Sequence, residues 1–170
     1  ENLNLGEVQA IGLAQDTLPN CTKLESLGLS VNDFGCKGAS ALARALPCCT
    51  YLQELWMFDT GIGDKGVLAF VNILPRLRSL RAFEFGANEI TDLAAIAIAE
   101  MLPQCQNVRF VGLRDNYIGD EGAAALEKTL SDCSTLRYFN FMDLTRNNIT
   151  EEAKKRLQIT IATRPEGVME

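Results

Sequence analysis

Apolar residues recur along this chain in a pattern that changes its period within each of several similar segments. In the stretch 108–130, VRFVGLRDNYIGDEGAAALEKTL, apolar side chains stand at Val108, Val111 and Leu113, and Asn116 follows three residues later. Alternation of apolar and polar positions is typical of a half-buried strand. The AAALEKTL run that follows has the composition of a short helix. The stretch therefore predicts a strand, a turn and a helix, in that order.

The same pattern occurs four times at a fixed spacing. Leu24, Leu52, Leu80 and Val108 begin the four units and are equally spaced, since the differences 52 − 24, 80 − 52 and 108 − 80 are the same. Each unit reads approximately L-x-x-L-x-L-x-x-N-x-I, with Thr60 in place of the Asn in the second unit, and continues into a helical run. A fixed period of this size indicates stacked repeats, in which each unit buries its apolar face against its neighbours.

Two polar positions recur with the repeat, and each predicts a structural role. The Asn at the ninth position (Asn32, Asn88 and Asn116) is expected to bond backbone groups where the chain turns away from the sheet, because buried N–H and C=O groups need partners. Thr60 offers fewer bonds there, so we expect a weak rung. An acidic residue recurs at each helix start (Asp64, Asp92 and Asp120), where we expect it to accept hydrogen bonds from free N–H groups.

Both ends of the chain depart from the regular period. Residues 1–23 form a partial unit in which the stretch Glu7–Pro19 supplies the helix. At the other end, the positions of Leu144, Asn147 and Ile149 place the last unit start at Phe139, whereas the regular period counted from Val108 would place it at Leu136. About three extra residues thus enter near 136–138, and the stretch 150–162 is expected to form a C-terminal capping helix.

This arithmetic predicts a single repeat domain over residues 1–170, with units beginning at about 24, 52, 80, 108 and 139. The sequence begins ENLNLGE, without an initiator Met or a signal-peptide pattern. We therefore expect the chain to be a fragment of a longer protein.

The units resemble leucine-rich repeats, and their LxxLxLxxNxIGDxGAxxLAxxL form is similar to the ribonuclease-inhibitor subclass. The resemblance implies an α/β leucine-rich repeat solenoid that is curved, with a parallel sheet on the concave face and helices on the convex face. Members of the subclass are mostly intracellular and mostly bind proteins; they include the sensor regions of NOD-like receptors. The resemblance thus implies a cytoplasmic protein-binding module and does not identify its partner.

Composition and charge narrow the function classes. The chain has 22 acidic and 16 basic residues and a net charge of −6, which argues against nucleic acid as a main ligand because phosphate binding needs a basic surface. No apolar run approaches the ~18 residues that a membrane helix needs. Histidine is absent, which excludes Ser–His–Asp and Cys–His catalysis and most zinc sites. We expect no enzyme activity, no catalytic residue, no metal and no cofactor.

Four of the six cysteines share one phase of the repeat, in the loop between a helix and the next strand: Cys21, Cys49, Cys105 and Cys133. A recurrent small side chain at this place predicts buried structural thiols, and disulfides or a metal are the alternatives. Leu77 occupies the same phase in the intervening unit, which disfavours both alternatives. Cys36 and the pair Cys48–Cys49 are the cysteines we expect to be more exposed.

The positions between the apolar strand residues project toward the concave face and vary from unit to unit. Those we predict to bind a partner are Glu54, Trp56, Phe58, Glu84, Phe110, Arg114 and Asp143. Trp and Arg are enriched among residues that anchor interfaces, and the nearby acids favour a partner with some basic character. The alternative interpretation is that Trp56 and Phe58 merely cover sheet surface bared by Gly28 and Gly86.

The sequence therefore predicts a protein-binding module that recognises a partner protein through its concave sheet, as the sensor or regulatory part of a larger intracellular protein. Two alternatives belong to other classes. A GTPase-activating regulator would need an exposed Arg beside a partner's nucleotide. A structural or self-assembling segment would associate through the apolar surface at the ends of the solenoid.

Overall fold

The computed structural model describes residues 5–134, 136, 139 and 141–163, and in this part of the chain strands alternate with helices. The strands are β1 Ser26–Gly28, β2 Glu54–Trp56, β3 Ala82–Glu84, β4 Phe110–Gly112 and β5 Phe141–Asp143. The α-helices are α1 Glu7–Gly12, α2 Gly35–Ala45, α3 Gly63–Val71, α4 Asp92–Met101, α5 Asp120–Asp132 and α6 Glu151–Ala162. A single-turn π-helix, Leu13–Thr17, extends α1.

The five strands form one parallel sheet in sequence order, β1 to β5. Leu27 pairs with Leu55, Leu55 with Phe83 and Phe83 with Val111, so each of these steps equals the period counted from the sequence. Val111 pairs with Met142, whereas the regular period would select Phe139. This is the offset counted from the sequence for the last unit, although Arg137 and Tyr138, where the extra residues were expected, lie outside the described residues.

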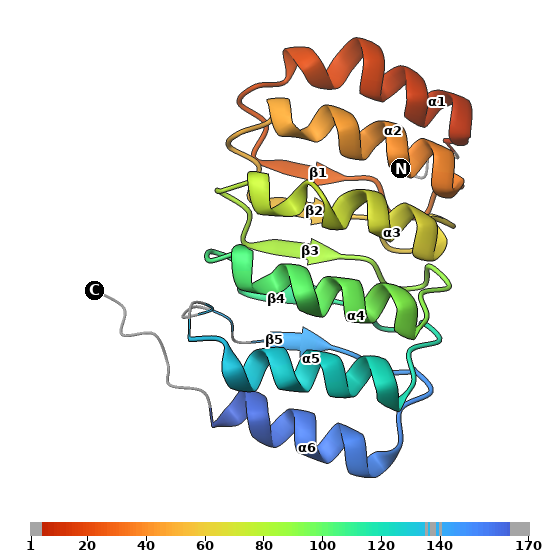
Figure 1. The fold of residues 1–170 in the computed structure, drawn as a ribbon. Helices are drawn as coiled ribbons and strands as arrows, with labels where there is room; N and C mark the ends of the chain where they lie inside the picture. Colours follow the sequence, from red (N-terminus) through yellow and green to blue (C-terminus); the bar gives the residue numbers. More distant parts are fainter. Residues whose placement is uncertain (1–4, 135, 137–138, 140, 164–170) are drawn as a thin grey trace.

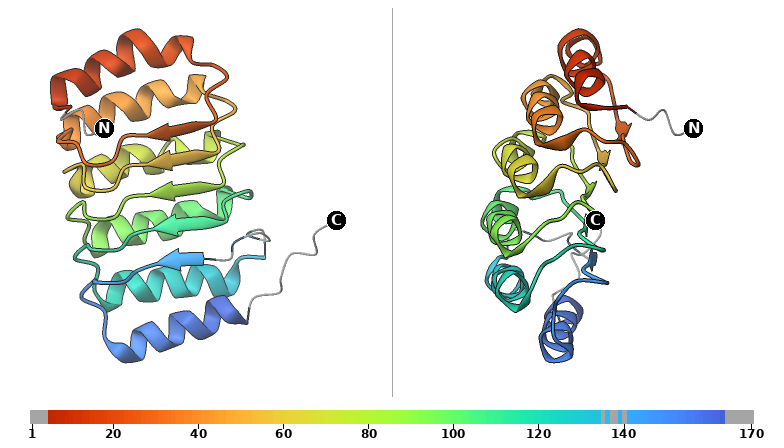
Figure 2. Two further views of the ribbon diagram at one scale, coloured as in Figure 1. Left: turned by 180° about the vertical axis from the view of Figure 1, so that it is seen from behind. Right: turned by 90° about the vertical axis from the view of Figure 1, so that its right-hand side faces the viewer.

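The chain therefore forms an α/β leucine-rich repeat solenoid, as the sequence predicts. The helices stack in order on one side of the sheet (Figure 1). Seen along the strands, the helices lie on the outer side of an arc and the strands on its inner side (Figure 2). A residue that projects from the sheet away from the helices therefore lies on the concave face.

The core lies between the sheet and the helices and repeats with each unit. The inward strand positions are fully buried in the middle of the array, as at Leu55, Phe83 and Val111. Leu27 of β1 is only half-buried, because no further strand covers β1 on its outer side within the described part of the chain. Each fully buried Leu or Phe side chain contributes about 1.5–3 kcal/mol to folding.

The ninth-position asparagines form a buried polar ladder along the turn between strand and helix. The Asn116 carboxamide oxygen accepts from the backbone N–H groups of Asn88 and Ile90, and its Nδ2 donates to the Phe85 and Leu113 carbonyls. Asn88 bonds the second unit in the same way. Each amide thus bonds its own turn and that of the preceding unit, which matches the predicted role.

The Thr60 rung uses backbone groups in place of an amide. The Thr60 hydroxyl donates to the Met57 carbonyl. The Asn32 and Phe34 N–H groups, which an Asn in the Thr60 position would bond, donate instead to the carbonyls of Asp59 and Thr60. The rung we expected to be weak is therefore satisfied: no buried side-chain N or O atom in the described part of the chain lacks a partner.

The recurrent aspartates accept hydrogen bonds from free N–H groups at helix starts, as expected, and these N–H groups belong to the helix of the next unit. Asp92 accepts hydrogen bonds from the N–H groups of Gly119 and Gly122, at the start of α5. Asp120 accepts from the backbone N–H and hydroxyl of Thr150, and these two bonds hold the pKa of its carboxyl below the ordinary range. The helix start of each unit lies against that of the next, so the carboxylate reaches its neighbour's free N–H groups.

The recurrent cysteines fill the coil between a helix and the next strand. Cys49 and Cys105 are buried, and Cys21 and Cys133 are half-buried. Cys49 was also expected among the exposed cysteines, and this expectation was wrong: its neighbour Cys48 is exposed, whereas Cys49 points into the core beside the Leu18 carbonyl. Burial raises the pKa of the Cys105 thiol to about 12.

The described part of the chain contains no helix that is both long and apolar enough to cross a membrane.

Candidate protein-binding face

Three rows of side chains cross the concave face from β1 to β5, because the strands pair in register. The first row is Ser26, Glu54, Ala82, Phe110 and Phe141, and the second is Gly28, Trp56, Glu84, Gly112 and Asp143. The third row follows the strand ends and contains Ser30, Phe58, Gly86, Arg114 and Thr145. Every residue predicted to bind a partner belongs to one of these rows.

Three aromatic rings lie in contact across the sheet and form what we call the aromatic row. The centroids of Trp56 and Phe110 are 6.0 Å apart, and those of Phe110 and Phe141 are 5.6 Å apart with an interplanar angle of 10°. The small side chain of Ala82, in the strand between β2 and β4, leaves room for the first contact. Each aromatic pair adds about 0.5–1.5 kcal/mol beyond its burial, so the rings are held in place before any partner arrives.

Phe58 and Arg114 form a second contact beside the aromatic row. The Arg114 guanidinium carbon lies 4.5 Å from the centre of the Phe58 ring, and the Phe58 ring lies over Gly86. A Cβ atom at Gly86 would lie 2.9 Å from Phe58 Cδ2 and 2.9 Å from the Arg114 carbonyl oxygen, so only glycine leaves the space. An exposed cation–π contact contributes about 0.5–1 kcal/mol.

Glu84 lies flat on the sheet and does not project from it, contrary to the expectation from the sequence. Its side chain is 8% exposed, lies over Gly112, and accepts a hydrogen bond of 2.7 Å from the Gly86 N–H. Desolvation raises the pKa of the Glu84 carboxyl; the Gly86 bond and the charge of Arg114 oppose this rise. Glu84 therefore forms the floor between the aromatic row and the Phe58–Arg114 contact, and its carboxylate is largely inaccessible to a partner.

The two other predicted carboxylates are bonded to side chains on the face. Glu54 is exposed and accepts from the Trp56 indole N–H at 3.2 Å and from the Ser26 hydroxyl at 3.1 Å. Asp143 is half-buried and accepts from the backbone N–H and the hydroxyl of Thr145. Glu54 thus orients the Trp56 ring, whereas Asp143 orders the end of β5.

The alternative interpretation of Trp56 and Phe58 holds for only one of them. Phe58 does lie over Gly86. A Cβ built at Gly28 would meet no atom within 4 Å, so Trp56 does not cover Gly28. The indole lies on the Phe110 side of β2 instead.

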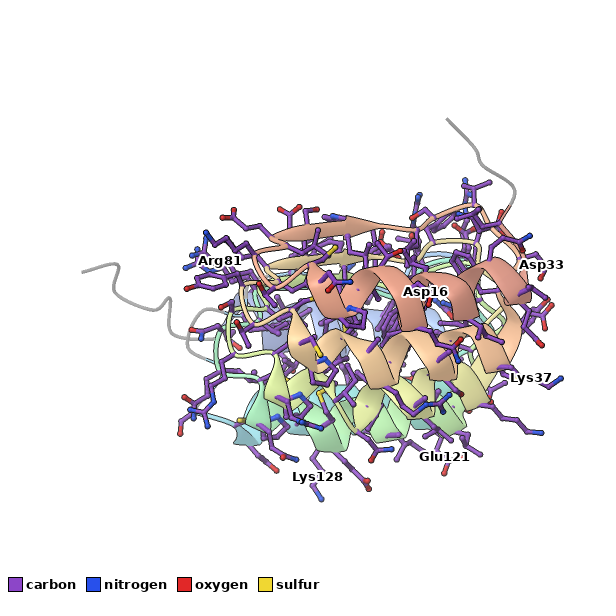
Figure 3. The ribbon with its side chains drawn as sticks, turned by 90° about the horizontal axis from the view of Figure 1, so that it is seen from above. Asp16, Asp33, Lys37, Arg81, Glu121 and Lys128 are labelled. Atoms are coloured by element: carbon purple, nitrogen blue, oxygen red, sulfur yellow. The ribbon has the colours of Figure 1, made fainter. Side chains whose placement is uncertain are left out.

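The structure adds one residue that was not among the predicted binding positions. Phe141 is 52% exposed and stacks on Phe110. The signal in the sequence was the shifted register of the last unit, which places Phe141 in the same row as Phe110. Arg81 lies at one edge of the solenoid, and Asp33 and Lys37 lie at the other edge (Figure 3).

Within residues 5–163, as far as they are described, no group of three or more Cys, Asp or Glu side chains is arranged to hold a metal ion. The carboxylates of the concave face are bonded to neighbouring backbone, hydroxyl or indole groups, as described above. The chemistry that this face offers is therefore aromatic and cation–π contact with polar groups at its margin.

Comparison with known proteins identifies the repeat. The family model described as "Leucine Rich repeat" matches residues 20–43, 48–71 and 104–126. A search of curated proteins found no match to the sequence.

Among solved structures, leiomodin-1 actin-binding site 2 is similar to this chain with a TM-score of 0.69 and 14% identity, covering 92% of this chain and 87% of that one. The tropomodulin C-terminal domain of Caenorhabditis elegans is similar with a TM-score of 0.62 and 14% identity, covering 92% of each chain. At this identity the likeness shows a common fold.

Proposed function

We propose, since the chain is a leucine-rich repeat protein, that it is a binding module which takes up a partner protein on its concave face. The binding surface is the concave patch, defined as the aromatic row (Trp56, Phe110 and Phe141) together with Phe58 and Arg114. Glu54 and Asp143 lie at its margin, and Glu84 forms its floor. This function requires no catalytic residue.

The observation that carries this proposal is the pre-formed aromatic row. Trp56 contacts Phe110, and Phe110 stacks on Phe141, while all three rings retain exposed surface. Rings that stay accessible although they are already fixed lose little conformational freedom on binding, which lowers the cost of association. Trp and Arg also dominate the binding energy of known interfaces.

The charges beside the patch favour a partner with basic side chains. Glu54 is exposed on the concave face and Asp143 is half-buried there, and Asp59, which follows Phe58 in the sequence, is exposed. The structural likeness to leiomodin-1 actin-binding site 2 makes actin a sensible first protein to test. We include in the proposal that the module serves as the sensor or regulatory part of a larger intracellular protein, in the manner of NOD-like receptors.

No observation specifically favours either alternative function. A GTPase-activating regulator needs an exposed Arg beside a partner's nucleotide, and a GTP hydrolysis assay with candidate GTPases tests this alternative. Self-association through the solenoid ends is tested by light scattering across a concentration series.

To test the proposal, partner proteins are first isolated from the native source. Each of them, and also actin, is then titrated with the wild type, with Trp56→Ala and with the double variant Trp56→Ala, Arg114→Ala. Trp56→Ala is expected to weaken binding by roughly 2 kcal/mol or more, as the loss of an interface anchor does. The double variant Trp56→Ala, Arg114→Ala is expected to weaken it further. Unchanged affinity of the double variant would remove the concave patch from the proposal.

Tyr51→Ala is the matched control for these variants. Tyr51 is also a large aromatic residue and is 58% exposed, but it directly precedes the second unit and lies outside the three rows. We expect Tyr51→Ala to bind the partner as the wild type does. A loss equal to that of Trp56→Ala would show that the partner uses another face.

A further inference from the structure

A groove lies on the convex side between the first two helices, away from the concave patch. Its volume is about 800 Å³. Residues of α1 and the turns after it form one wall, residues of α2 form the other, and α3 contributes one side chain. The side chains that line it include Ala14, Cys36, Ala41, Arg44, Cys48 and Lys65.

The floor of the groove is apolar because small residues face each other there. Ala14 is 5% exposed and Ala41 is 7% exposed, and both belong to the hydrophobic core. Ile11 and Ala45 are half-buried beside them. Alanines in the facing positions fill less volume than leucines would, so a hollow remains between the two helices.

The rim of the groove is positively charged although the protein is acidic. Lys37, Arg44 and Lys65 are exposed, and the lining contains no Asp or Glu. Among the described residues, the only ion pair of these three is Lys37 with Glu7 at 3.5 Å, with both side chains largely in solvent, and such a surface pair is worth at most about 1 kcal/mol. The positive charge of these three side chains is therefore little neutralised by acidic neighbours.

One departure from the repeat removes a carboxylate from this place. Asp64 occupies the corresponding position in the second unit and Asp92 in the third, whereas the first unit has Cys36 there. The first unit is thus the one whose helix start lacks the acidic residue. The helix start beside this groove therefore has no carboxylate at the position that Asp64 and Asp92 occupy in the next two units.

We infer that this groove binds an amphipathic helix of a partner protein, one whose apolar face is bordered by Glu or Asp side chains. The stretch from Cys36 to Ala45 spans about 14 Å, which accommodates roughly two and a half turns of a helix. Helices commonly dock their apolar face into grooves of this kind. Complementary charge at the rim would fix the orientation of the helix and exclude basic ones.

The test uses a designed peptide of about 18 residues, long enough to form a helix, with an apolar stripe flanked by Glu, and a second peptide with Lys in place of each Glu. The two exposed cysteines of the groove, Cys36 and Cys48, report occupancy through their rate of alkylation, read by mass spectrometry of the wild-type protein. The Glu peptide is expected to slow both reactions at least fivefold, and the Lys peptide is expected to leave them unchanged.

A groove triple, Lys37→Glu with Arg44→Glu and Lys65→Glu, is expected to weaken binding of the Glu peptide at least tenfold. The control triple carries the same change in net charge on exposed residues elsewhere, Arg76→Glu with Lys128→Glu and Lys155→Glu, and is expected to bind as wild type. Trp56→Ala is likewise expected to bind the peptide normally, so this inference and the concave proposal fail separately.

Three results would overturn the inference. The first is no protection of Cys36 and Cys48 at saturating peptide, and the second is equal weakening by the groove triple and the control triple. The third is a wild-type dimer in sedimentation that the groove triple converts to a monomer, because a second copy of the chain would then be the occupant.

Discussion

The asparagine ladder and the concave patch are built from the same units but follow opposite rules. Along the ladder, Asn88 and Asn116 make nearly the same bonds to the turn of the preceding unit, each 28 residues earlier. Across the concave face no row repeats: Trp56 is followed by Glu84 and then by Gly112. The ladder joins each unit to the next, whereas the patch depends on a particular combination of unlike neighbours.

This difference separates the residues that serve stability from those available for binding. A ladder amide is buried and its partners are backbone groups, so its loss leaves unpaired polar groups in the core. A patch residue keeps exposed surface, and its partners are mostly other side chains at the surface. Changes in the ladder should therefore reduce the free energy of unfolding, and changes in the patch should reduce affinity.

The largest effect is expected for Asn88→Ala. The Asn88 amide makes five hydrogen bonds, to groups of Met57, Thr60, Ile62 and Gly86, and the residue is 0% exposed. Its removal should lower the free energy of unfolding by about 3–5 kcal/mol, because several buried groups lose their partners. Urea unfolding measures this, with the exposed Asn72→Ala as a control that should cost far less.

Trp56→Ala should show the opposite behaviour. Its affinity for a partner should fall by roughly 2 kcal/mol or more. Its unfolding free energy should fall by less than that of Asn88→Ala, because Trp56 is only half-buried and its loss leaves no buried polar group unpaired. Parallel titration and urea unfolding of the same sample give both numbers. A stability loss as large as that of Asn88→Ala would contradict the division between ladder and patch.

Thr60→Val tests the one rung that lacks an asparagine. Valine keeps the shape of the side chain but loses the hydroxyl that bonds the Met57 carbonyl and the Asn88 amide oxygen. We expect a loss of about 1–2 kcal/mol in the free energy of unfolding, since the backbone bonds of this rung remain. A loss equal to that of Asn88→Ala would show that the Thr60 hydroxyl carries the rung.

Val31→Asn should stabilise the protein. Val31 has φ of 59° and is 45% exposed, and the residue before the ladder position also has positive φ at Asp59, Ala87, Asp115 and Arg146. A β-branched residue is disfavoured in the left-handed region, which Asn tolerates. The expected gain is about 0.5–1 kcal/mol in urea unfolding. Val8→Asn, on a helix with normal φ, is the control and should give no gain.

The smallest effect is expected for Glu84→Gln and depends on pH. The pKa of Glu84 is raised above its ordinary 4.5, so the folded protein binds this proton more tightly than the unfolded chain and loses stability as pH rises through the raised pKa. Gln can still accept from the Gly86 N–H and has no charge to desolvate. At pH 7 the variant should melt slightly higher than wild type.

A pH series supplies the internal control for Glu84→Gln. The difference in melting temperature should shrink as the pH falls toward the ordinary value of the carboxyl, because wild-type Glu84 is then protonated as well. A difference that stays constant over this range would show that the charge of Glu84 does not contribute.

Much of the fold was predictable because the same pattern recurs in each unit, so that a role assigned in one unit can be checked in the others. The spacing of Leu24, Leu52, Leu80 and Val108 predicted the parallel sheet and the regular register of its strands. The ladder role of Asn88 and Asn116 followed from their phase and from the need of buried turns for hydrogen bonds. These inferences held because a buried, repeated environment selects the same residue type each time.

The residues that face the concave side were predictable, but their contacts were not. Alternation along a strand placed Trp56 and Glu84 outside the core. It did not show that Glu84 would lie over Gly112, or that Trp56 in β2 would contact Phe110 in β4, two strands away. Both outcomes depend on small residues in neighbouring strands, which leave space that a longer side chain fills.

The sequence by itself thus determined the order and spacing of the strands, the face on which their residues lie and the identity of the ladder, because these follow from the local period. Only the tertiary structure decided which neighbour each side chain meets. It showed that Asp92 bonds the helix start of the next unit, that Phe141 completes the aromatic row, and that a cationic groove opens beside Cys36. The physical reason is that such contacts depend on the sizes and directions of side chains from different units, and only the packing of those units sets both.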